Sequence, residues 1–390
     1  MRITIVCDVL GKANNGTSIA AYNLINFMLS RGHEVHVVCG DEERTGEKGY
    51  YVVPTRSFGI FNGYVEHNGV KITKKDDLVL MRAIRGSDIV HIMMPFGLGK
   101  RAAKICYRYG IPCTAGFHVQ AENFSSHFFG EKNPIFNWAV YLYFYDKMYK
   151  YIDAIHYPSS FIQKEFEAQV GKKTHGYVIS NGVEKDFCPG PSERPGYLKD
   201  KILILFSGRY TREKAQHILI KAIKYSKYAD KIQLIFAGQG PRDNYLKALT
   251  KSERLLNYPI FQFFTHDEIV KTIRMCDLYV HPSNMEIEGI SCLEAIAGGL
   301  VPIVSDSKKS ATREFAYDEL NLFKADDPKD LALKIDYWIA NPKAKKKRAK
   351  QYRKFLRQFD RDNCMRAMEK MFNDTINECK GKKVPHEGIK

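Results

Sequence analysis

Three common classes of protein are excluded by what this sequence lacks. Its 390 residues contain no apolar run of ~18 residues, the length that a membrane-spanning helix needs. The opening residues, MRITIVCDVLGKANNG, have no long apolar core like that of a secretory signal, and they read better as a buried strand and a loop. Nine cysteines are scattered singly, with no CxxC pair and no histidine at metal-binding spacing. We therefore expect reduced thiols and a cytoplasmic protein.

The composition is that of a folded protein. Hydrophobic residues make up 44% of the chain and charged residues 27%, which is far from the composition of disordered proteins. A chain of this length exceeds what one hydrophobic core usually organises, so two domains of similar size are expected.

Short apolar stretches alternate with helical patterns along the chain. RITIVC (2–7) reads as a buried strand, and TSIAAYNLINFMLSRG (17–32) has apolar residues three and four apart. The alternation restarts at KILILFSG (201–208), after a polar stretch rich in proline and glycine. We predict two doubly wound α/β domains with parallel sheets, covering residues 1–180 and 181–360.

In such sheets, ligands bind in the loops that follow the carboxyl ends of the strands. After the first strand, Gly16 leads into a helix whose free amides could approach a phosphate or a sugar, or it serves only the turn. Arg209 and Lys214 follow the strand KILILFSG, where two cations suit a diphosphate, although an ordinary exposed helix start is the alternative. Gly240 lies in the next such loop, AGQGP, and lets the backbone pass close to a ligand or simply turn.

The stretch MEIEGISCLEAIAGGLVP (285–302) combines carboxylates with a helix start. If the helix begins near Gly289, its first amides favour a phosphate, and carboxylates beside a diphosphate must accept hydrogen bonds from hydroxyl groups. Sugars and ribose supply such hydroxyls, which indicates a ligand for Glu286 and Glu294. For Glu288 we prefer the simpler interpretation, in which it complements the helix N-terminus.

These residues carry a resemblance to a known family. HPSNMEIEGISCLEAIAGGLVPIVSD resembles the donor-sugar signature of the retaining GT4 glycosyltransferases, with two glutamates eight positions apart. SGRYTREKA, AGQGP and ISNGV are similar to three further segments of that family, so the resemblance covers nearly the whole chain. It implies the GT-B fold, two Rossmann-like domains facing across a cleft, with residues 361–390 forming a helix that crosses back to the first domain and a tail. Asn15, Ala215 and Ile287 stand where the family usually has glycine.

The resemblance also implies a role for each residue of the donor site. Glu294 would hold the nucleotide ribose and Glu286 the hydroxyl groups of the donor sugar, while Arg209 and Lys214 would neutralise the diphosphate. The remaining contacts implied are the amides of Ile290 and Ser291 for the diphosphate, the turn at Gly240 close to the ligand, Gly16 beneath the phosphates or sugar, His118 at the sugar, and Phe264 and Thr265 at the base.

Leaving-group stabilisation would then be the main catalytic effect, because two cations and helix amides meet the charge that develops on the departing diphosphate. That chemistry needs no metal and no cofactor; the donor is a UDP-sugar, with a GDP-sugar as the alternative. The only Asp-x-Asp pair, Asp360 and Asp362, lies in a helical pattern far from any strand end, which argues against the metal-dependent GT-A class. Retention by same-face attack follows from the resemblance alone.

The acceptor is predicted from charge and aromatic content. The formal net charge is +16, and the last sixty residues hold 17 lysines and arginines against 7 acidic residues. NPKAKKKRAKQYRKFLRQF (341–359), which includes Lys345, Lys346 and Lys347, is either a solvated helix face or a surface for an anionic partner.

Two stretches of the first domain indicate what that partner is. Residues 128–157 interleave Trp138 and many Phe and Tyr residues with Lys132, Lys147 and Lys150, and a nearby helix carries Lys100, Lys104 and Arg108 on one stripe. Core packing is one interpretation; contact with the membrane interface is the other. SDSKKSATREFA (305–316) resembles the diacylglycerol glucosyltransferases.

We therefore predict transfer of a hexose, with glucose expected, to a glycerolipid such as diacylglycerol at the cytoplasmic leaflet, by a peripheral membrane protein. The alternatives are a soluble or polysaccharide acceptor and, from another class, a non-catalytic basic protein that binds nucleic acid. No nucleic-acid-binding motif is present, so we expect no nucleic-acid partner.

Overall fold

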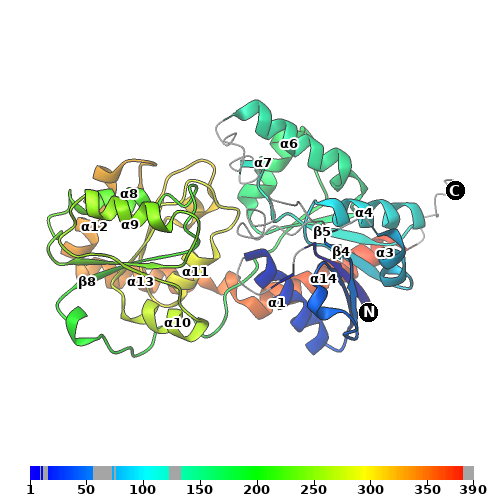
Figure 1. Cartoon of the computed structure of the whole chain (residues 1–390), viewed down its shortest axis with the longest axis horizontal. Helices are drawn as coiled ribbons and strands as arrows, with labels where there is room; N and C mark the ends of the chain where they lie inside the picture. The colour runs from blue at the N-terminus through cyan, green and yellow to red at the C-terminus, as the bar shows by residue number, and fades with distance from the viewer. Residues whose placement is uncertain (9, 12–15, 56–72, 74–75, 123–132, 381–390) are drawn as a thin grey trace. The chain divides into compact units, whose positions relative to one another are not determined.

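A computed structural model covers the chain and describes residues 1–8, 10–11, 16–55, 73, 76–122 and 133–380. It divides into two compact units, the first formed by Met1–Asn181 with Asp362–Lys390 and the second by Gly182–Arg361. Figure 1 shows a parallel sheet with helices on both faces in each unit. The prediction of two separate doubly wound α/β units is confirmed.

The first unit contains a seven-stranded sheet in the order β3-β2-β1-β4-β5-β6-β7, and every pairing is parallel. Its strands are β1 (Arg2–Val6), β2 (Glu34–Cys39), β3 (Tyr50–Val52), β4 (Ile89–Ile92), β5 (Cys113–Gly116), β6 (Ala154–Tyr157) and β7 (Gly176–Val178). The central strands are buried on both faces, which explains why they read as continuous apolar runs in the sequence.

Helices cover both faces of this sheet (Figure 1). They are α1 (Gly16–Ser30), α3 (Asp77–Ile84), α4 (Gly97–Tyr109), α6 (Pro134–Lys147), α7 (Ser160–Val170) and α14 (Arg361–Cys379). The amphipathic α14 packs Met365, Met368 and Phe372 into the same apolar core as Leu24 and Met28 of α1. The last helix of the chain therefore completes the core of the first unit.

The second unit has a six-stranded parallel sheet in the order β10-β9-β8-β11-β12-β13. Its strands are β8 (Ile202–Ser207), β9 (Ile232–Ala237), β10 (Ile260–Gln262), β11 (Leu278–His281), β12 (Pro302–Ser305) and β13 (Leu322–Phe323), and its helices are α8 (Gln216–Ile223), α9 (Asp243–Ser252), α10 (His266–Met275), α11 (Ile290–Ala297), α12 (Pro328–Ala340) and α13 (Pro342–Phe355). In Figure 1, α8, α9 and α12 lie on one face of this sheet, while α10, α11 and α13 lie on the other. The strand order reverses between β8 and β11, so the loops after these two strands meet at a switch point.

The chain enters and leaves the second unit along neighbouring paths. Val183 and Asp360 form an isolated parallel bridge, and the amide of Val183 donates to the carbonyl of Phe359 at 2.7 Å. Gly182 has a φ of 80°, and a Cβ there would lie 2.5 Å from Cα of Arg361. Only glycine fits this crossing without displacing the backbone.

Candidate active site

The loop after β8 is held by close backbone packing against the loop after β9. A Cβ on Gly238 would lie 2.0 Å from the carbonyl oxygen of Gly208, and one on Gly240 would lie 2.7 Å from the amide nitrogen of Tyr210. The structure therefore explains both glycines by the approach of one loop to the other. The predicted contact between Gly240 and a ligand stays a prediction.

Lys214 and Glu286, 72 positions apart in the sequence, form an ion pair. Lys214 lies just before α8, and Glu286 follows β11; the amide of Asn284 donates to the carbonyl of Glu213 at 2.8 Å and ties the two loops together. Ala215, next to Lys214, has a φ of 49° in the left-handed region. This explains why the family prefers glycine there, and why Ala215 adds a modest strain of ~1 kcal/mol.

Glu286 accepts a second hydrogen bond at the same oxygen. Nε2 of His281 lies 2.8 Å from Oε1 of Glu286, the oxygen that also contacts Lys214. Burial alone would raise the pKa of Glu286, but the charge of Lys214 and the His281 hydrogen bond together lower that pKa to about 2. Glu286 is therefore a carboxylate over the whole physiological pH range.

The groups that support Glu286 were not predicted from the sequence. His281 is the last residue of β11, and its Nδ1 lies 3.0 Å from Oη of Tyr279, which in turn lies 3.2 Å from Oγ of Ser291 on α11. A histidine directly at a strand end, in the sequence DLYVHPS, was the feature that could have indicated this role.

The N-terminus of α11 is open for an anion. Gly289 precedes the helix with a φ of 87°, and a Cβ there would lie 2.2 Å from Cγ2 of Thr312. No hydrogen-bond partner for the amides of Ile290 and Ser291 is found in the described part of the chain. Free amides at a helix start bind phosphate well, because the helix dipole adds partial positive charge there.

Glu294 lies one turn further along α11. Its carboxylate is half-buried and makes no hydrogen bond or ion pair with any residue that the structure describes. Burial, with the charge of Glu184 nearby, raises the pKa of Glu294 to about 7. An unsatisfied acid in this position is a ready acceptor for ribose hydroxyls.

The other predicted residues of this unit occupy strand-end loops. Arg209 is exposed directly after Gly208, whose φ is 147°. Phe264 and Thr265, which the resemblance implies as contacts of the base, follow β10. The amide of Thr265 donates to the Glu268 side chain in a capping box at the start of α10, so that amide is already occupied.

Two predicted residues belong to the first unit. Gly16 is exposed at the start of α1, and a Cβ there would meet nothing within 4 Å, so packing does not require glycine. His118 follows β5 and lies over Gly116, where a Cβ would come within 2.4 Å of the imidazole Nε2. Burial and the neighbouring His156 lower the pKa of His118 to about 3, so its imidazole is neutral at pH 7.

Within the described residues, one group has the composition of a metal site. Ligand atoms of Glu184, Asp186 and His266 lie within 4.8 Å of one another. Glu184 is already paired with Arg361 at 2.7 Å, and the other two side chains are exposed. The predicted Asp-x-Asp pair takes no part in this group: Asp360 bridges to Val183 and Asp362 lies in the first turn of α14.

Cations, free helix amides and carboxylates thus surround the switch point of the second unit, which is an arrangement for a phosphorylated sugar. Residues 14–187 match the family model described as Glycosyltransferase Family 4, and residues 192–355 match the model described as Glycosyl transferases group 1. The chain belongs to the GT4 glycosyltransferases. The resemblance to this family that was stated from the sequence is confirmed.

Comparison with known members of the family shows how closely this chain is related to them. This GT4 chain is 24% identical over 233 residues to alpha-monoglucosyldiacylglycerol synthase of Streptococcus pneumoniae, covering 56% of this chain and 51% of the relative. It is 24% identical over 330 residues to GDP-mannose-dependent alpha-mannosyltransferase of Corynebacterium glutamicum, covering 78% and 72%. The chain therefore spans only about half the length of the pneumococcal relative.

Solved structures confirm the GT-B fold of this GT4 chain. HepE of Anabaena, solved in complex with UDP and glucose, superposes with a TM-score of 0.70 over 96% of this chain and 100% of that one, at 16% identity. At this identity the likeness shows the fold alone.

The raised pKa of Glu294 predicts how stability depends on pH. A carboxyl with a folded pKa of about 7 gives stability that is complete below its unfolded pKa of ~4.3 and is lost as the pH rises through 7. Glu294→Gln should therefore stabilise the protein at pH 8 by about 2 kcal/mol and change little at pH 4. Urea unfolding at both pH values, with exposed Glu193→Gln as control, checks this; equal effects at both pH values would contradict it.

Proposed function

We propose that this glycosyltransferase moves a hexose, with glucose expected, from a nucleoside diphosphate sugar to a hydroxyl group of a membrane lipid such as diacylglycerol, with retention of configuration. One observation carries the donor part of the proposal. The unsatisfied Glu294 carboxylate lies one turn along α11 from the free amides at its N-terminus, so acceptors for ribose hydroxyls and donors for phosphate share one helix.

The chemistry follows from the charges at this site. When the bond between the sugar and the diphosphate breaks, negative charge builds on the departing phosphate. Lys214, Arg209 and the amides of Ile290 and Ser291 are the groups that would meet that charge, and removing one such donor typically costs 10²–10³ in rate. These fixed positive groups supply the neutralisation that a metal gives elsewhere, so we propose a metal-independent reaction that chelators leave unchanged.

Each unit has one predicted group for a sugar. In the second unit, Glu286 stays ionised at the physiological pH and can accept hydrogen bonds from sugar hydroxyls. In the first unit, His118 is neutral and can donate one hydrogen bond to a hydroxyl. The acceptor hydroxyl would attack from the face that the diphosphate leaves.

The donor is proposed as a UDP-sugar. Its support is the UDP complex of HepE, which shares the fold. The GDP-mannose-dependent relative keeps a GDP-sugar as the alternative donor.

The proposal of a lipid acceptor depends on helix α6 of the first unit. The buried face of α6 presents Val140, Tyr141 and Phe144, yet its opposite face exposes a second apolar stripe. In that stripe Ile135 is 74% exposed and Trp138 is 47% exposed. An aromatic and aliphatic stripe at helical spacing, open to solvent, matches a helix that lies in the membrane interface.

Basic side chains accompany this stripe. Lys147 and Lys150 follow it, and Lys100 of α4 donates to Oη of Tyr143 at 2.8 Å. Lys132 lies outside the described residues. The name of the pneumococcal relative, alpha-monoglucosyldiacylglycerol synthase, supports the same acceptor class. None of the helices in the described part of the chain has the length and apolar character that crossing a bilayer requires. We therefore propose peripheral attachment to the inner face of the cell membrane.

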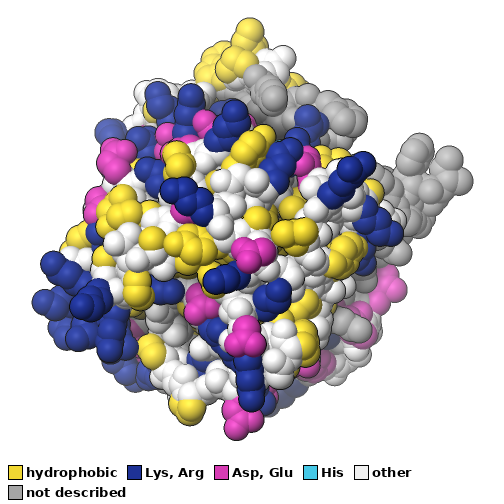
Figure 2. Space-filling view, turned by 90° about the vertical axis from the view of Figure 1, so that its left-hand side faces the viewer, with side chains coloured by type: hydrophobic (Ala, Val, Ile, Leu, Met, Phe, Trp, Pro, Cys, Tyr) yellow, Lys and Arg dark blue, Asp and Glu magenta, His cyan; other side chains and the backbone are white. Residues whose placement is uncertain are grey.

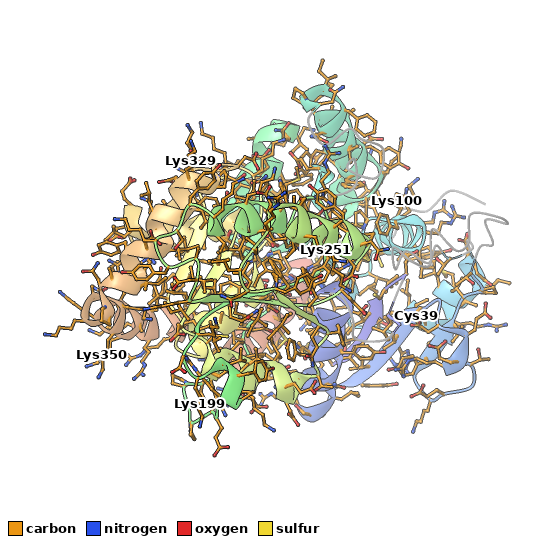
Figure 3. The ribbon with its side chains drawn as sticks, turned by 60° about the vertical axis from the view of Figure 1, so that its left-hand side comes forward. Cys39, Lys100, Lys199, Lys251, Lys329 and Lys350 are labelled. Carbon is orange, nitrogen blue, oxygen red and sulfur yellow. The ribbon has the colours of Figure 1, made fainter. Side chains whose placement is uncertain are left out.

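Helix α13 supplies further positive charge. Lys346, Lys347 and Lys350 are exposed, whereas Lys345 is half-buried near Asp277 and Arg194, and burial lowers the pKa of Lys345. Figure 2 shows Lys and Arg side chains gathered at the left edge of the face it presents, and Figure 3 shows Lys350 pointing outward. Each such cation near an anionic leaflet contributes about 1 kcal/mol.

Activity is tested directly with purified full-length protein. It is incubated with UDP-glucose, UDP-galactose or GDP-mannose and with vesicles of phosphatidylglycerol and diacylglycerol, with or without EDTA. We expect a hexose on diacylglycerol by mass spectrometry, with UDP-glucose best and no effect of EDTA. Transfer at full rate to a water-soluble acceptor without vesicles would replace the lipid proposal by the soluble-acceptor alternative.

The α6 stripe makes a separate prediction. Replacing Ile135 and Trp138 with glutamate should lower vesicle co-sedimentation at least tenfold, since burying each such side chain is worth about 1.5–3 kcal/mol. Leu78→Glu on α3 is the matched control, because Leu78 is 72% exposed on the same unit. Equal loss in the control, or no loss in the double variant, would remove α6 from the proposal.

Charge reversal of α13 tests the electrostatic part. Lys346, Lys347 and Lys350 replaced by glutamate should weaken binding to anionic vesicles and abolish its salt dependence, while Lys199→Glu with Lys251→Glu should not. Unchanged sedimentation, or retention of duplex DNA instead of vesicles by the native protein, would count against membrane contact through α13.

A further inference from the structure

Both donors to Glu286 converge on a single oxygen. Lys214 and His281 contact Oε1, while no partner for Oε2 is found among the described residues. The backbone of Glu286 is also held, because its amide donates to the carbonyl of Lys309 and its carbonyl accepts from the amide of Ala311 at 2.9 Å. Oε2 is therefore presented in a defined direction.

The two donors differ in their freedom to move. The side chain of Lys214 is 20% exposed and has a flexible four-carbon stem, so its ammonium can reach another anion nearby. His281 has no exposed surface, and its ring is stacked against Phe206 with centroids 6.2 Å apart. Only Lys214 can change its partner without repacking the core of the unit.

The hydrogen bonds of His281 also assign its proton. A carboxylate oxygen only accepts, so Nε2 carries the hydrogen and donates to Glu286. Nδ1 then accepts from the hydroxyl of Tyr279, 3.0 Å away. Tyr279 is itself fully buried, so the imidazole is held in one orientation and one tautomer from both sides.

We infer that His281 is a positioning residue that keeps the Glu286 carboxylate in place when Lys214 turns from Glu286 to the diphosphate of the donor. This inference rests on the proposed function, in which Lys214 neutralises the diphosphate. The ammonium has three N–H donors, but movement toward the diphosphate draws it away from Oε1, whereas the imidazole keeps its bond to Oε1 throughout. Oε2 then remains directed at the sugar hydroxyls, so loss of His281 affects recognition of the sugar and leaves recognition of the nucleotide intact.

Two substitutions by amide side chains test the two ring nitrogens of His281 separately. The amide of glutamine in His281→Gln can imitate Nε2–H and reach Glu286, while the shorter amide of His281→Asn imitates only Nδ1 and stays with Tyr279. Binding of UDP-glucose and of UDP is measured by calorimetry on the full chain. His281→Asn should weaken the affinity for UDP-glucose about tenfold or more, as expected for loss of a hydrogen bond to a charged group. Its affinity for UDP should stay within twofold of the native value. His281→Gln should keep UDP-glucose within about threefold.

Each other outcome has a definite meaning. If both variants bind UDP-glucose like the native protein, the positioning role is wrong. It is also wrong if both variants lose affinity for UDP and for UDP-glucose by the same factor. If the native protein binds UDP-glucose no better than UDP, and the same holds for GDP-mannose against GDP, the donor proposal fails instead. If His281→Asn does not fold, Tyr279→Phe serves in its place; it removes the hydroxyl that contacts Nδ1 of His281 and Oγ of Ser291 and should weaken binding of UDP-glucose but not of UDP.

Discussion

Replacing Lys214 with alanine is expected to lower the rate of sugar transfer by about 10²–10³-fold, because the departing diphosphate then lacks one of the positive groups that meet its charge. Lys214→Arg should recover part of that loss, since it keeps the charge. The rate constant at saturating donor, measured with vesicles as acceptor, reports the effect. A loss confined to the apparent affinity for donor, with an unchanged maximal rate, would contradict the role in leaving-group stabilisation.

The same change should destabilise the fold. It leaves the Glu286 carboxylate, which is 11% exposed, with His281 as its only donor, and removing one partner of such a pair costs about 3 kcal/mol. The depressed pKa of Glu286 gives stability that is present above its unfolded pKa of ~4.3 and is lost as the pH falls toward 2. The difference between Lys214→Ala and the native protein should therefore shrink from pH 7 to pH 3.

A matched lysine provides the control for both effects. Lys251 is exposed on α9 of the same unit and is labelled in Figure 3. Lys251→Ala should change neither the transfer rate nor the urea midpoint by a measurable amount. If it lowered the rate as Lys214→Ala does, the loss would reflect the net charge of the unit and not the site.

Gly289→Ala should be strongly destabilising. The φ of 87° costs a non-glycine residue about 1–3 kcal/mol, and the new Cβ would lie 2.2 Å from Cγ2 of Thr312. We expect a loss of about 3 kcal/mol in unfolding free energy. Transfer should fall as well, because the helix start that presents the amides of Ile290 and Ser291 is displaced.

Gly196→Ala is the control for Gly289→Ala. It lies in the same unit, and a Cβ there would meet nothing within 4 Å. Its unfolding free energy should stay within about 0.5 kcal/mol of the native value, as for ordinary surface substitutions. A Gly289→Ala protein with native stability would mean that Thr312 and the loop adapt, which the packing at this turn argues against.

Much of the donor site was predictable because its residues follow strands directly. A helix start near Gly289 was considered from the sequence, and α11 begins at Ile290. The placement of Arg209 and Lys214 after β8 was predicted from the end of an apolar run. Local geometry dictates such features within a few residues, so a sequence pattern can carry them.

The partners within the site were not predictable in the same way. Lys214 and Glu286 were assigned to different parts of the donor, and their pairing depends on two loops brought together by the strand order. Lys345 appeared equivalent to Lys346 and Lys347 in a basic run, but packing of α13 turns Lys345 toward Asp277. Helical periodicity shows which residues share a face of a helix, but it does not show which face is covered by neighbouring elements.

By itself, the sequence determined that this chain forms two parallel α/β units and that one of them carries the donor signature of a GT4 glycosyltransferase. Both follow from local periodicity and from residues that stand together at strand ends. Only the tertiary structure decided that His281 and Tyr279 hold Glu286, that Glu294 has no partner among the described residues, and that α6 exposes a second apolar face. Those facts depend on distances between residues far apart in the chain, which hydrophobic burial and the sheet order set together.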